Sequence, residues 1–314
     1  LRHNKLITGL LQKHFKSRAE PYDVVLVPTT VLYHWIAWRW LVWRGIGKWF
    51  QRVVLTARNN AGEYDPELKT YTFNSSAKVL AGVLRTFRRP VENGTVELAS
   101  DSDVLCRQYN SLCGLPFHPY PHPRPTDHLP IPERREREEL VFSALGPPRY
   151  EKGSDLIVEA IQTLFKENPD FPGRFVLQWT AEVHTPHGKE IALPDEWRDH
   201  PKIEIIRESL SSEDYQQRID ESDVILVPYR RAQYHARLSG IAIEAFQSGV
   251  PCICISDTWV GECMARIGKG VSMADESAPS LLRSINQFIE ETPVNVRMTK
   301  SEVTQARKAH SPEA

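Results

Sequence analysis

The chain has 314 residues and a mass of 36.0 kDa, with 41% hydrophobic and 25% charged residues. This composition is typical of a soluble globular protein with room for two domains, and it excludes a largely disordered chain. The formal net charge is only −1. Because the sequence has no run of 18 uninterrupted apolar residues, no conventional transmembrane helix is predicted.

The small net charge hides an uneven distribution. Residues 1–58 hold ten Lys and Arg side chains against two acidic ones, a local charge of +8, and the rest of the chain therefore carries −9. A basic segment in a nearly neutral protein predicts an anionic neighbour, such as a membrane surface or a nucleic acid.

Before residue 116, short apolar segments alternate with amphipathic ones, as in parallel α/β domains. The predicted helices are 4–16, 31–50, 76–89 and 102–112, and the predicted strands are 23–28, 53–56 and 95–99. We expect an N-terminal Rossmann-like domain over 1–115. The sequence does not begin with Met, so we expect that this domain has further residues upstream.

The stretch 31–50 interleaves five tryptophans with Arg39, Arg44 and Lys48. Apolar residues fall on all sides of the predicted helix, which favours a helix packed in the core. Contact with a membrane interface is the second interpretation, and stacking on single-stranded nucleic acid is the third. We predict no nucleic-acid partner.

Seven prolines lie between residues 116 and 132, and a run of charges follows them. Such a segment cannot form a helix or a central strand, so we expect a semi-rigid interdomain linker over 116–138.

After the linker the alternation of strands and helices is clearer. The predicted strands are 140–145, 175–179, 202–206, 223–227 and 251–255, and the predicted helices are 154–165, 212–221, 240–248 and 259–267. We expect a C-terminal domain over 139–294 and a helix or tail over 295–314. The predicted fold is therefore α/β, with two Rossmann-like domains facing across a cleft and ligands at the carboxyl ends of the strands.

Five cysteines, an odd and low number, predict reduced thiols in the cytoplasm rather than a disulfide framework. Cys252 and Cys254 alternate within an apolar run, so we expect both thiols to be buried on one face of a strand. No second pair has the spacing of zinc ligands, and we predict no metal site. No secretory signal is visible at the start of the sequence, which agrees with a cytoplasmic location.

Ser239 and Gly240 open a predicted helix shortly after the strand 223–227. Ser239 is a good N-cap, and Gly240 lets an anion approach the backbone closely. The free N–H groups of residues 240–242 and the positive end of the helix dipole then predict a phosphate site. Glu244, one turn further, is placed to accept hydrogen bonds from a ribose. The alternative is an ordinary capped surface helix.

Arg149 and Lys152 lie in a loop directly after the predicted strand 140–145. In a parallel sheet this loop and Ser239 lie at the same edge, so a guanidinium fork and an ammonium group would face the helix N-terminus. The arrangement predicts a clamp for a diphosphate. The alternative is an ordinary solvated loop.

These segments resemble the donor-binding half of GT-B glycosyltransferases, specifically the family-4 type. The matching motifs are Glu-Lys-Gly-x-Asp-Leu at 151–156, Asp-Val-Ile-Leu-Val-Pro-Tyr at 223–229, Arg-x-Ser-Gly-Ile-x-x-Glu-Ala at 237–245, Gly-x-Pro at 249–251 and Gly-Lys-Gly at 268–270. The resemblance covers about 139–292, and only the order and spacing of elements are similar upstream. It implies transfer of a sugar from a nucleotide-diphosphate-sugar donor, with retention and without a metal or other cofactor.

The resemblance also implies roles for individual residues. Arg149 and Lys152 would be catalytic because they would stabilise the departing diphosphate. The predicted donor-binding residues are Tyr229, Tyr234, Arg237, Ser239, Gly240, Ile241 and Glu244.

The chain departs from the family pattern at several positions. Ala236 stands where the family usually has a Glu that contacts the transferred sugar, and Tyr234, His235 or Arg237 are candidates to replace it. Pro147 stands where the family has an Arg, with an arginine two positions later. The glycine-rich loop of the family's N-terminal domain is missing, and Arg58 follows a strand at which the family often has a His.

The sequence therefore predicts a cytoplasmic hexosyltransferase-type enzyme of polysaccharide or glycoconjugate biosynthesis. Its acceptor would be a glycan or a lipid-linked molecule on the side of the N-terminal domain, with peripheral membrane contact through residues 1–58. The rival hypothesis, favoured by Ala236, is a non-catalytic glycan-assembly scaffold with a degenerate donor site. A nucleotide-sugar epimerase is a further alternative, and we expect the loop 207–210 to select the base.

Overall fold

The computed structural model divides the chain into two compact units. Unit 1 contains residues 1–122 with 236–238, and unit 2 contains 123–235 with 239–314. The residues that the structure describes are 8–10, 13, 22–44, 50–65, 67–120, 139–291 and 297–309. Most of the predicted helix 4–16 and of the predicted linker 116–138 therefore lies outside the described residues.

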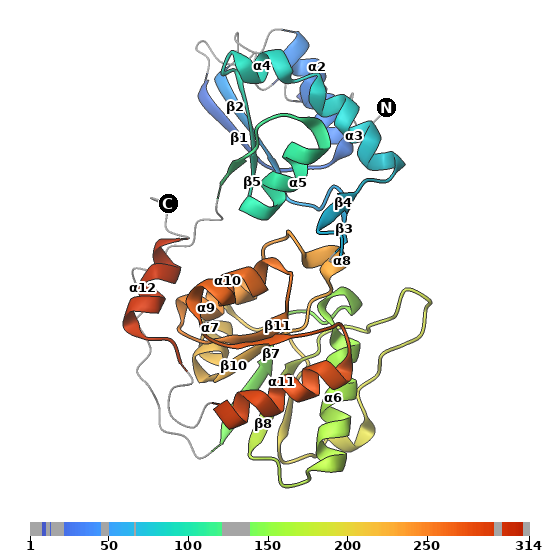
Figure 1. Ribbon diagram of the computed structural model, residues 1–314, viewed down its shortest axis with the longest axis vertical. Helices are drawn as coiled ribbons and strands as arrows, with labels where there is room; N and C mark the ends of the chain where they lie inside the picture. Colours follow the sequence, from blue (N-terminus) through green and yellow to red (C-terminus); the bar gives the residue numbers. More distant parts are fainter. Residues whose placement is uncertain are drawn as a thin grey trace. The chain divides into compact units, whose positions relative to one another are not determined.

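Unit 1 is built on a four-stranded parallel sheet with the order β1-β2-β5-β6 (Figure 1). The sheet strands are β1 (Tyr22–Thr30), β2 (Phe50–Ala57), β5 (Val96–Ser100) and β6 (His118–Pro119), and a hairpin pairs β3 (Glu63–Asp65) with β4 (Thr70–Thr72). The helices are α2 (Leu32–Trp43), α3 (Ser75–Arg85), α4 (Arg88–Glu92) and α5 (Asp103–Cys113). Helix α3 contacts both α2 and α5, so these three helices form one layer on the sheet.

The helix predicted over 31–50 is too long. It ends at Trp43, and Phe50 is fully buried as the first residue of β2. In an apolar segment without clear hydrophobic periodicity, the sequence pattern does not separate helix from strand, and this explains the error. The core interpretation holds for one face of α2 only, because Trp35 is 1% exposed and Trp43 is 78% exposed.

Two other boundaries in unit 1 differ from the prediction. The helix predicted over 76–89 is interrupted after Arg85, where the Thr86 hydroxyl donates to the Val83 carbonyl oxygen at 2.6 Å. The linker was predicted from residue 116, but Pro119 belongs to β6, which pairs with β5. Strand β6 is at the edge of the sheet, where a proline is tolerated although it has no backbone N–H to bond to a neighbouring strand.

Unit 2 is built on a six-stranded parallel sheet with the order β12-β11-β10-β7-β8-β9. Its strands are β7 (Leu140–Ala144), β8 (Gly173–Gln178), β9 (Ile203–Ile206), β10 (Val224–Val227), β11 (Cys252–Ile255) and β12 (Val271–Met273). Its α-helices are α6 (Ser154–Glu167), α7 (Ser212–Glu221), α8 (Arg231–Tyr234), α9 (Gly240–Gln247), α10 (Trp259–Ile267), α11 (Ala278–Glu291) and α12 (Lys300–Lys308), with 3-10 turns η2 (Tyr150–Lys152) and η3 (Asp195–Trp197).

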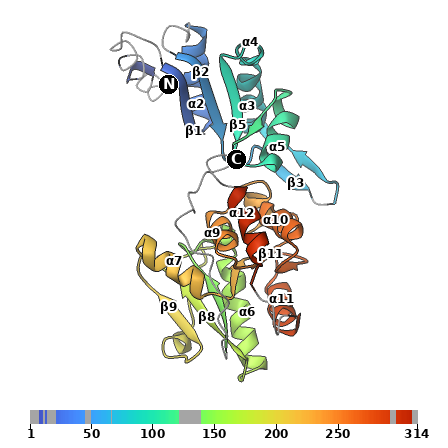
Figure 2. The same ribbon diagram turned by 90° about the vertical axis from the view of Figure 1, so that its left-hand side faces the viewer.

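The helices of unit 2 cover both faces of this sheet (Figure 2). Helices α6 and α11 pack against each other, and α9 packs with α7 and α12. This doubly covered sheet buries its strands almost completely, which explains their short continuous apolar runs. The strand order changes direction between β10 and β7, and ligands of open α/β sheets bind at the carboxyl ends of the strands at such a point.

All five cysteines are buried, and none of them forms a disulfide. Burial raises the pKa of Cys254 on β11 to about 12 and that of Cys252 well above its ordinary value. The prediction of buried structural thiols is therefore confirmed. Within the described part of the chain, no helix is long and apolar enough to cross a membrane, and no group of three metal-ligating side chains is found there.

Candidate functional site

The candidate site of unit 2 begins at the loop that follows β7. The chain leaves β7 through Gly146, with φ 88°, and enters α6 at Gly153, with φ 72°. Both glycines have left-handed backbone, which other residues rarely adopt. A Cβ on Gly153 would also lie 2.3 Å from the Pro228 carbonyl oxygen. The loop that carries Lys152 therefore packs against the end of β10 at a distance that only glycine permits.

Arg230 fastens this loop to the end of β10. Its Nη2 donates to Asp155 Oδ2 at 2.5 Å, and its Nε donates to the Tyr150 carbonyl oxygen at 3.2 Å. The Arg230 backbone N–H donates to the Glu151 carbonyl oxygen at 3.0 Å, and the guanidinium lies 4.0 Å from the centre of the Tyr150 ring. Because the Arg230 side chain is only 12% exposed, these contacts are well shielded from water. The sequence analysis did not single out this residue.

Glu276 holds the same segment from a second direction. Its carboxylate accepts from the Arg231 backbone N–H at 2.8 Å and lies 3.7 Å from Arg230 Nη1. The Arg231 Nε in turn donates to the Ser256 carbonyl oxygen at 3.0 Å. These contacts hold the segment after β10 in place, and a fixed arrangement of charges is what an electrostatic site would need.

Tyr229 lies at the centre of the site. Burial raises its pKa well above the ordinary value, so its hydroxyl stays protonated. Its ring centre lies 4.4 Å from that of Tyr234 and 5.7 Å from Lys152 Nζ. The nearby Ser239 side chain lowers the Tyr229 pKa and so opposes part of this rise. One buried tyrosine therefore connects the cationic loop with the N-terminus of α9.

The N-terminus of α9 has the predicted cap, but this cap takes up the N–H of Ala242, which was predicted to be free together with those of Gly240 and Ile241. The Ser239 hydroxyl accepts from the Ala242 N–H at 3.3 Å, and Ser239 itself is 2% exposed. A Cβ on Gly240 would meet nothing within 4 Å, so the space in front of the first turn is open. Ile241 is buried and Glu244 is half-buried one turn further along the helix. Open N–H groups at the positive end of a helix are suited to an anion.

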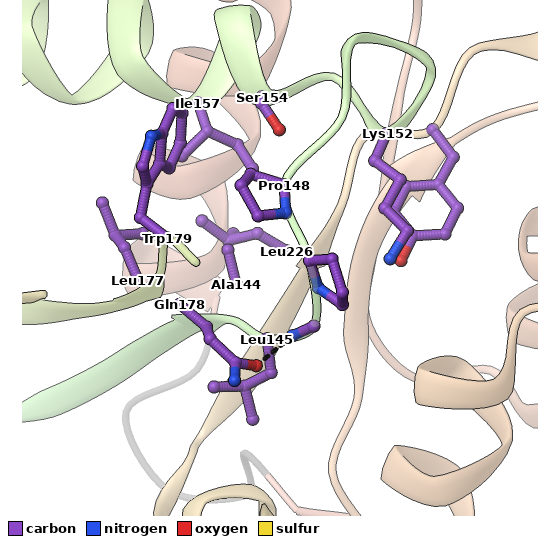
Figure 3. A pocket seen from close by; sticks show the side chains of 13 residues that line it. Ala144, Leu145, Pro148, Lys152, Ser154, Ile157, Leu177, Gln178, Trp179 and Leu226 are labelled. Atoms are coloured by element: carbon purple, nitrogen blue, oxygen red, sulfur yellow. Dashed lines mark hydrogen bonds between the residues drawn. The ribbon is translucent and has the colours of Figure 1, made fainter. Parts of the chain in front are cut away.

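A pocket lies beside this site, between the ends of β7, β8 and β10 (Figure 3). The pocket is partly open to solvent, and its cavity volume is about 30 Å³, which is enough for a water molecule. Figure 3 shows Lys152 away from the apolar side chains Ile157 and Trp179. Gln178 accepts from the Gly146 N–H at 2.6 Å and donates to the Glu208 carbonyl oxygen at 3.1 Å. This amide therefore joins the cationic loop to the loop 207–210.

The structure brings some of the predicted site residues together and leaves others apart. Lys152, Tyr229, Tyr234 and Ser239 form one cluster, with Gly240, Ile241 and Glu244 following in α9. The Arg149 side chain is 55% exposed and lies 3.6 Å from Glu151. Arg237 belongs to the segment 236–238, which groups with unit 1.

Three supporting residues that the sequence analysis missed are Asp155, Arg230 and Glu276. Asp155 lies in the quoted motif 151–156, and Arg230 follows the strand motif that ends at Tyr229. The sequence signal that could have pointed to Asp155 and Arg230 is that each is a charged residue within or directly beside a quoted motif. Their contacts were not predictable because they join segments 45 to 75 residues apart in the sequence.

A second polar cluster lies at the carboxyl edge of the sheet in unit 1. Arg58 follows β2 and Asp101 follows β5, and Arg58 Nε lies 3.4 Å from Asp101 Oδ2. The Asp101 side chain is 8% exposed, and its Oδ1 is buried without a hydrogen-bond partner. Burial raises the Asp101 pKa from 3.8 to about 6, against the opposing influence of Arg58.

Comparison with known proteins matched no family model and no curated protein. Solved structures do match. The N-terminal domain of trehalose-6-phosphate phosphatase from Candida albicans is 12% identical, with a TM-score of 0.60 over 98% of this chain and 69% of that one. The UDP-forming α,α-trehalose-phosphate synthase from Burkholderia xenovorans is 11% identical, with a TM-score of 0.62 over 98% and 73%.

A third structure, α,α-trehalose 6-phosphate synthase from Burkholderia multivorans, is 11% identical, with a TM-score of 0.62 over 98% of this chain and 72% of that one. At such low identities the similarity shows the fold alone. The chain thus has the α/β fold of GT-B proteins, with a Rossmann-like parallel sheet in each unit. The fold prediction is confirmed. None of these structures is of the family-4 type that the sequence motifs suggested.

Proposed function

We propose that this protein is a glycosyltransferase that moves a sugar from a nucleotide-diphosphate-sugar donor bound in unit 2. The observation that carries the proposal is the cluster around Tyr229, which joins the Lys152 ammonium to the open N-terminus of α9. A cation and a set of free N–H groups at one strand edge are suited to a diphosphate. One structural neighbour is a UDP-forming α,α-trehalose-phosphate synthase, and its reaction class agrees with this chemistry.

The proposed catalysis is mainly electrostatic. As the bond between sugar and diphosphate breaks, negative charge grows on the leaving phosphate oxygens, and Lys152 and Arg149 stabilise it. The N–H groups of Gly240 and Ile241 bind the same phosphates, while Glu244 accepts hydrogen bonds from the ribose. These fixed charges take the role that a metal ion has in other phosphate sites, so the proposed reaction uses no metal and no resident cofactor.

The roles of Tyr229 and Tyr234 follow from their burial. Both side chains are 5% exposed and their rings contact each other, so they form the floor on which Lys152 and Ser239 are positioned. We propose Arg237 as a further donor-binding residue, and Tyr234, His235 and Arg237 stay the candidates to replace the side chain that is missing at Ala236. Retention of the anomeric configuration is part of the same proposal.

The proposed acceptor is a glycan or a lipid-linked molecule, and the proposed process is polysaccharide or glycoconjugate synthesis. Buried cysteines that form no disulfide favour a reducing compartment, and we propose that the protein is cytoplasmic. Peripheral membrane contact would come from the basic segment 1–58.

A non-catalytic scaffold is the second candidate. The observation that favours it is Ala236, which is fully buried and offers no polar group for a sugar. A scaffold would bind a nucleotide without turning over the donor.

Donor turnover tests the proposal. We would incubate the protein with UDP-, GDP- and ADP-glucose, with and without a mixture of glycan acceptors, and measure release of the nucleoside diphosphate. We expect release from one of the three donors, and at least tenfold less release from Glu244→Gln because its ribose contact is weakened. Glu213→Gln is the matched control, since Glu213 is exposed on α7. Nucleotide binding without release from any donor would favour the scaffold.

A further inference from the structure

Helix α2 is apolar on both faces, and only one of them is covered. Its inner face carries Trp35, Ala37, Trp38 and Leu41, all buried. The Trp35 ring contacts Phe87 with 6.0 Å between centres, and the Trp38 ring contacts Phe50 with 6.1 Å. These contacts account for the packing of α2 in unit 1.

The opposite face, here called the α2 outer face, consists of Tyr33, Ile36, Trp40 and Trp43. Their spacing of three or four residues places them along one side of the helix. Tyr33 is 43% exposed, Ile36 is 40% exposed and Trp43 is 78% exposed, while Trp40 is half-buried. A continuous apolar stripe of this kind on a surface indicates a contact with another body.

Cations border the α2 outer face on both sides. Arg39 is exposed, and its Nε donates to the Thr86 hydroxyl at 2.7 Å. The Arg44 guanidinium lies 3.6 Å from the centre of the Trp40 ring. The helix itself is one-sided in charge, because residues 31–44 contain these two arginines and no acidic residue. The partner of this face is therefore expected to be both apolar and anionic.

Two other partners fit this face less well. A single-stranded nucleic acid would stack its bases on open rings, but one face of the Trp40 ring is already covered by Arg44. A second copy of the chain would bring the same arginines against each other across a symmetric contact, which like charges oppose. An anionic bilayer accepts both features, because tryptophan and tyrosine are favoured at headgroup level and arginine pairs with lipid phosphate.

We propose that the α2 outer face docks unit 1 on an anionic membrane surface, with the helix lying parallel to that surface. Tyr33, Ile36 and Trp43 enter the boundary between headgroups and acyl chains, and Arg39 and Arg44 bind anionic lipid. This inference does not depend on the proposed sugar transfer. It also narrows the predicted membrane segment from residues 1–58 to one face of one helix.

The experiment is co-sedimentation of the full chain with two kinds of vesicle, phosphatidylcholine alone and phosphatidylcholine with about 30 mol% phosphatidylglycerol. The second composition has roughly the surface charge of an anionic leaflet. We expect binding to the anionic vesicles that weakens in high salt. Trp43→Ala is expected to weaken binding about tenfold by removing buried apolar area. Arg39→Gln and Arg44→Gln are expected to weaken it about fivefold each.

Leu68→Ser and Val79→Ser are matched controls, because these apolar side chains of unit 1 are 73% and 56% exposed but lie outside the α2 outer face. Both are expected to bind as the unchanged protein does, and so is the donor-site variant Lys152→Met. Circular dichroism checks that Trp43→Ala remains folded. Three results would overturn the proposal. They are no binding to anionic vesicles, a loss of vesicle binding in Leu68→Ser as large as that in Trp43→Ala, or a dimer that forms without lipid and that Trp43→Ala dissociates.

Discussion

The two units of this chain use apolar residues in opposite ways. Unit 2 buries them on both faces of a six-stranded sheet, and its polar residues gather at the strand ends, around Tyr229. Unit 1 has a four-stranded sheet, and every large exposed apolar side chain of the described residues belongs to it. This difference agrees with the two proposals made above, a small anionic ligand for unit 2 and a large partner surface for unit 1.

The edge strand β1 shows the contrast within one element. Val24 is 47% exposed and Leu26 is 58% exposed, while the alternating Val25 and Val27 are half-buried. In a strand this alternation places the two exposed side chains on one face. No strand of unit 2 has a comparable apolar face open to solvent among the described residues.

The largest expected effect lies in the core of unit 2. Phe142 is fully buried, and its ring lies within 6 Å of the rings of Phe171, Phe175 and Phe288. Phe142→Ala is expected to lower the free energy of unfolding by about 3–5 kcal/mol. Trp43→Ala in unit 1, although it removes a larger side chain, is expected to cost less than about 0.5 kcal/mol because Trp43 is largely exposed. Urea unfolding measures both values. A similar loss of unfolding free energy in the two variants would contradict the proposed difference between unit 2 and unit 1.

The next effect concerns Lys152. If Lys152 stabilises the departing diphosphate, Lys152→Met is expected to lower kcat about 10²–10³-fold. Arg149→Met is expected to lower it less, because the Arg149 side chain is 55% exposed and lies beside Glu151. Steady-state kinetics with the donor identified above measure both. A larger loss from Arg149→Met than from Lys152→Met would reverse the assignment.

The Asp101 carboxyl group in unit 1 gives a pH dependence. Burial raises its folded pKa to about 6 from 3.8, so the folded state binds the proton more tightly than the unfolded state. Stability from this group is therefore present below about pH 4 and is lost as the pH rises to about 6, up to roughly 3 kcal/mol in total.

Urea unfolding at a series of pH values from about 4 to 7 tests this expectation. Asp101→Asn is expected to remove the contribution and to flatten the pH profile relative to the unchanged protein. Asp103→Asn is the control, because Asp103 is exposed in the first turn of α5. If the two variants have the same profile, the shifted acid is not Asp101.

The smallest of these effects concerns Arg230, a positioning residue. Arg230→Met is expected to lower kcat about tenfold and to leave KM for the donor nearly unchanged, because it frees the loop that holds Lys152. Arg230→Lys is expected to restore part of the rate by keeping the charge beside Asp155. In the Lys152→Met background, Arg230→Met should have little further effect. Additive losses in the double variant would show that Arg230 does not act through Lys152.

Much of unit 2 was predictable from sequence because local signals agree with the fold there. The bounds predicted for α7 and α10 match the structure, since Ser211 and Thr258 cap them and each helix has one apolar face. The caps and glycines that build the N-terminus of α9 were visible for the same reason. Caps, glycines and apolar faces are local features of the chain, so a single sequence is enough to predict them.

Other features depend on distant contacts and were not predictable. The hairpin of β3 and β4 was missed because its short strands carry polar residues. The role of Arg230 follows from Asp155 and Tyr150, which belong to a different loop. The open face of α2 was missed because an apolar helix shows no preferred side in its sequence.

The measurement that tests the central claim most directly is calorimetric titration of the protein with UDP, GDP and ADP. It should include Glu244→Ala and Gly240→Val, which places a side chain in the open space before α9. We predict that one nucleotide binds selectively and that each variant weakens its affinity at least tenfold. If no nucleotide binds the unchanged protein, or if both variants bind as tightly as it does, unit 2 is not a donor site.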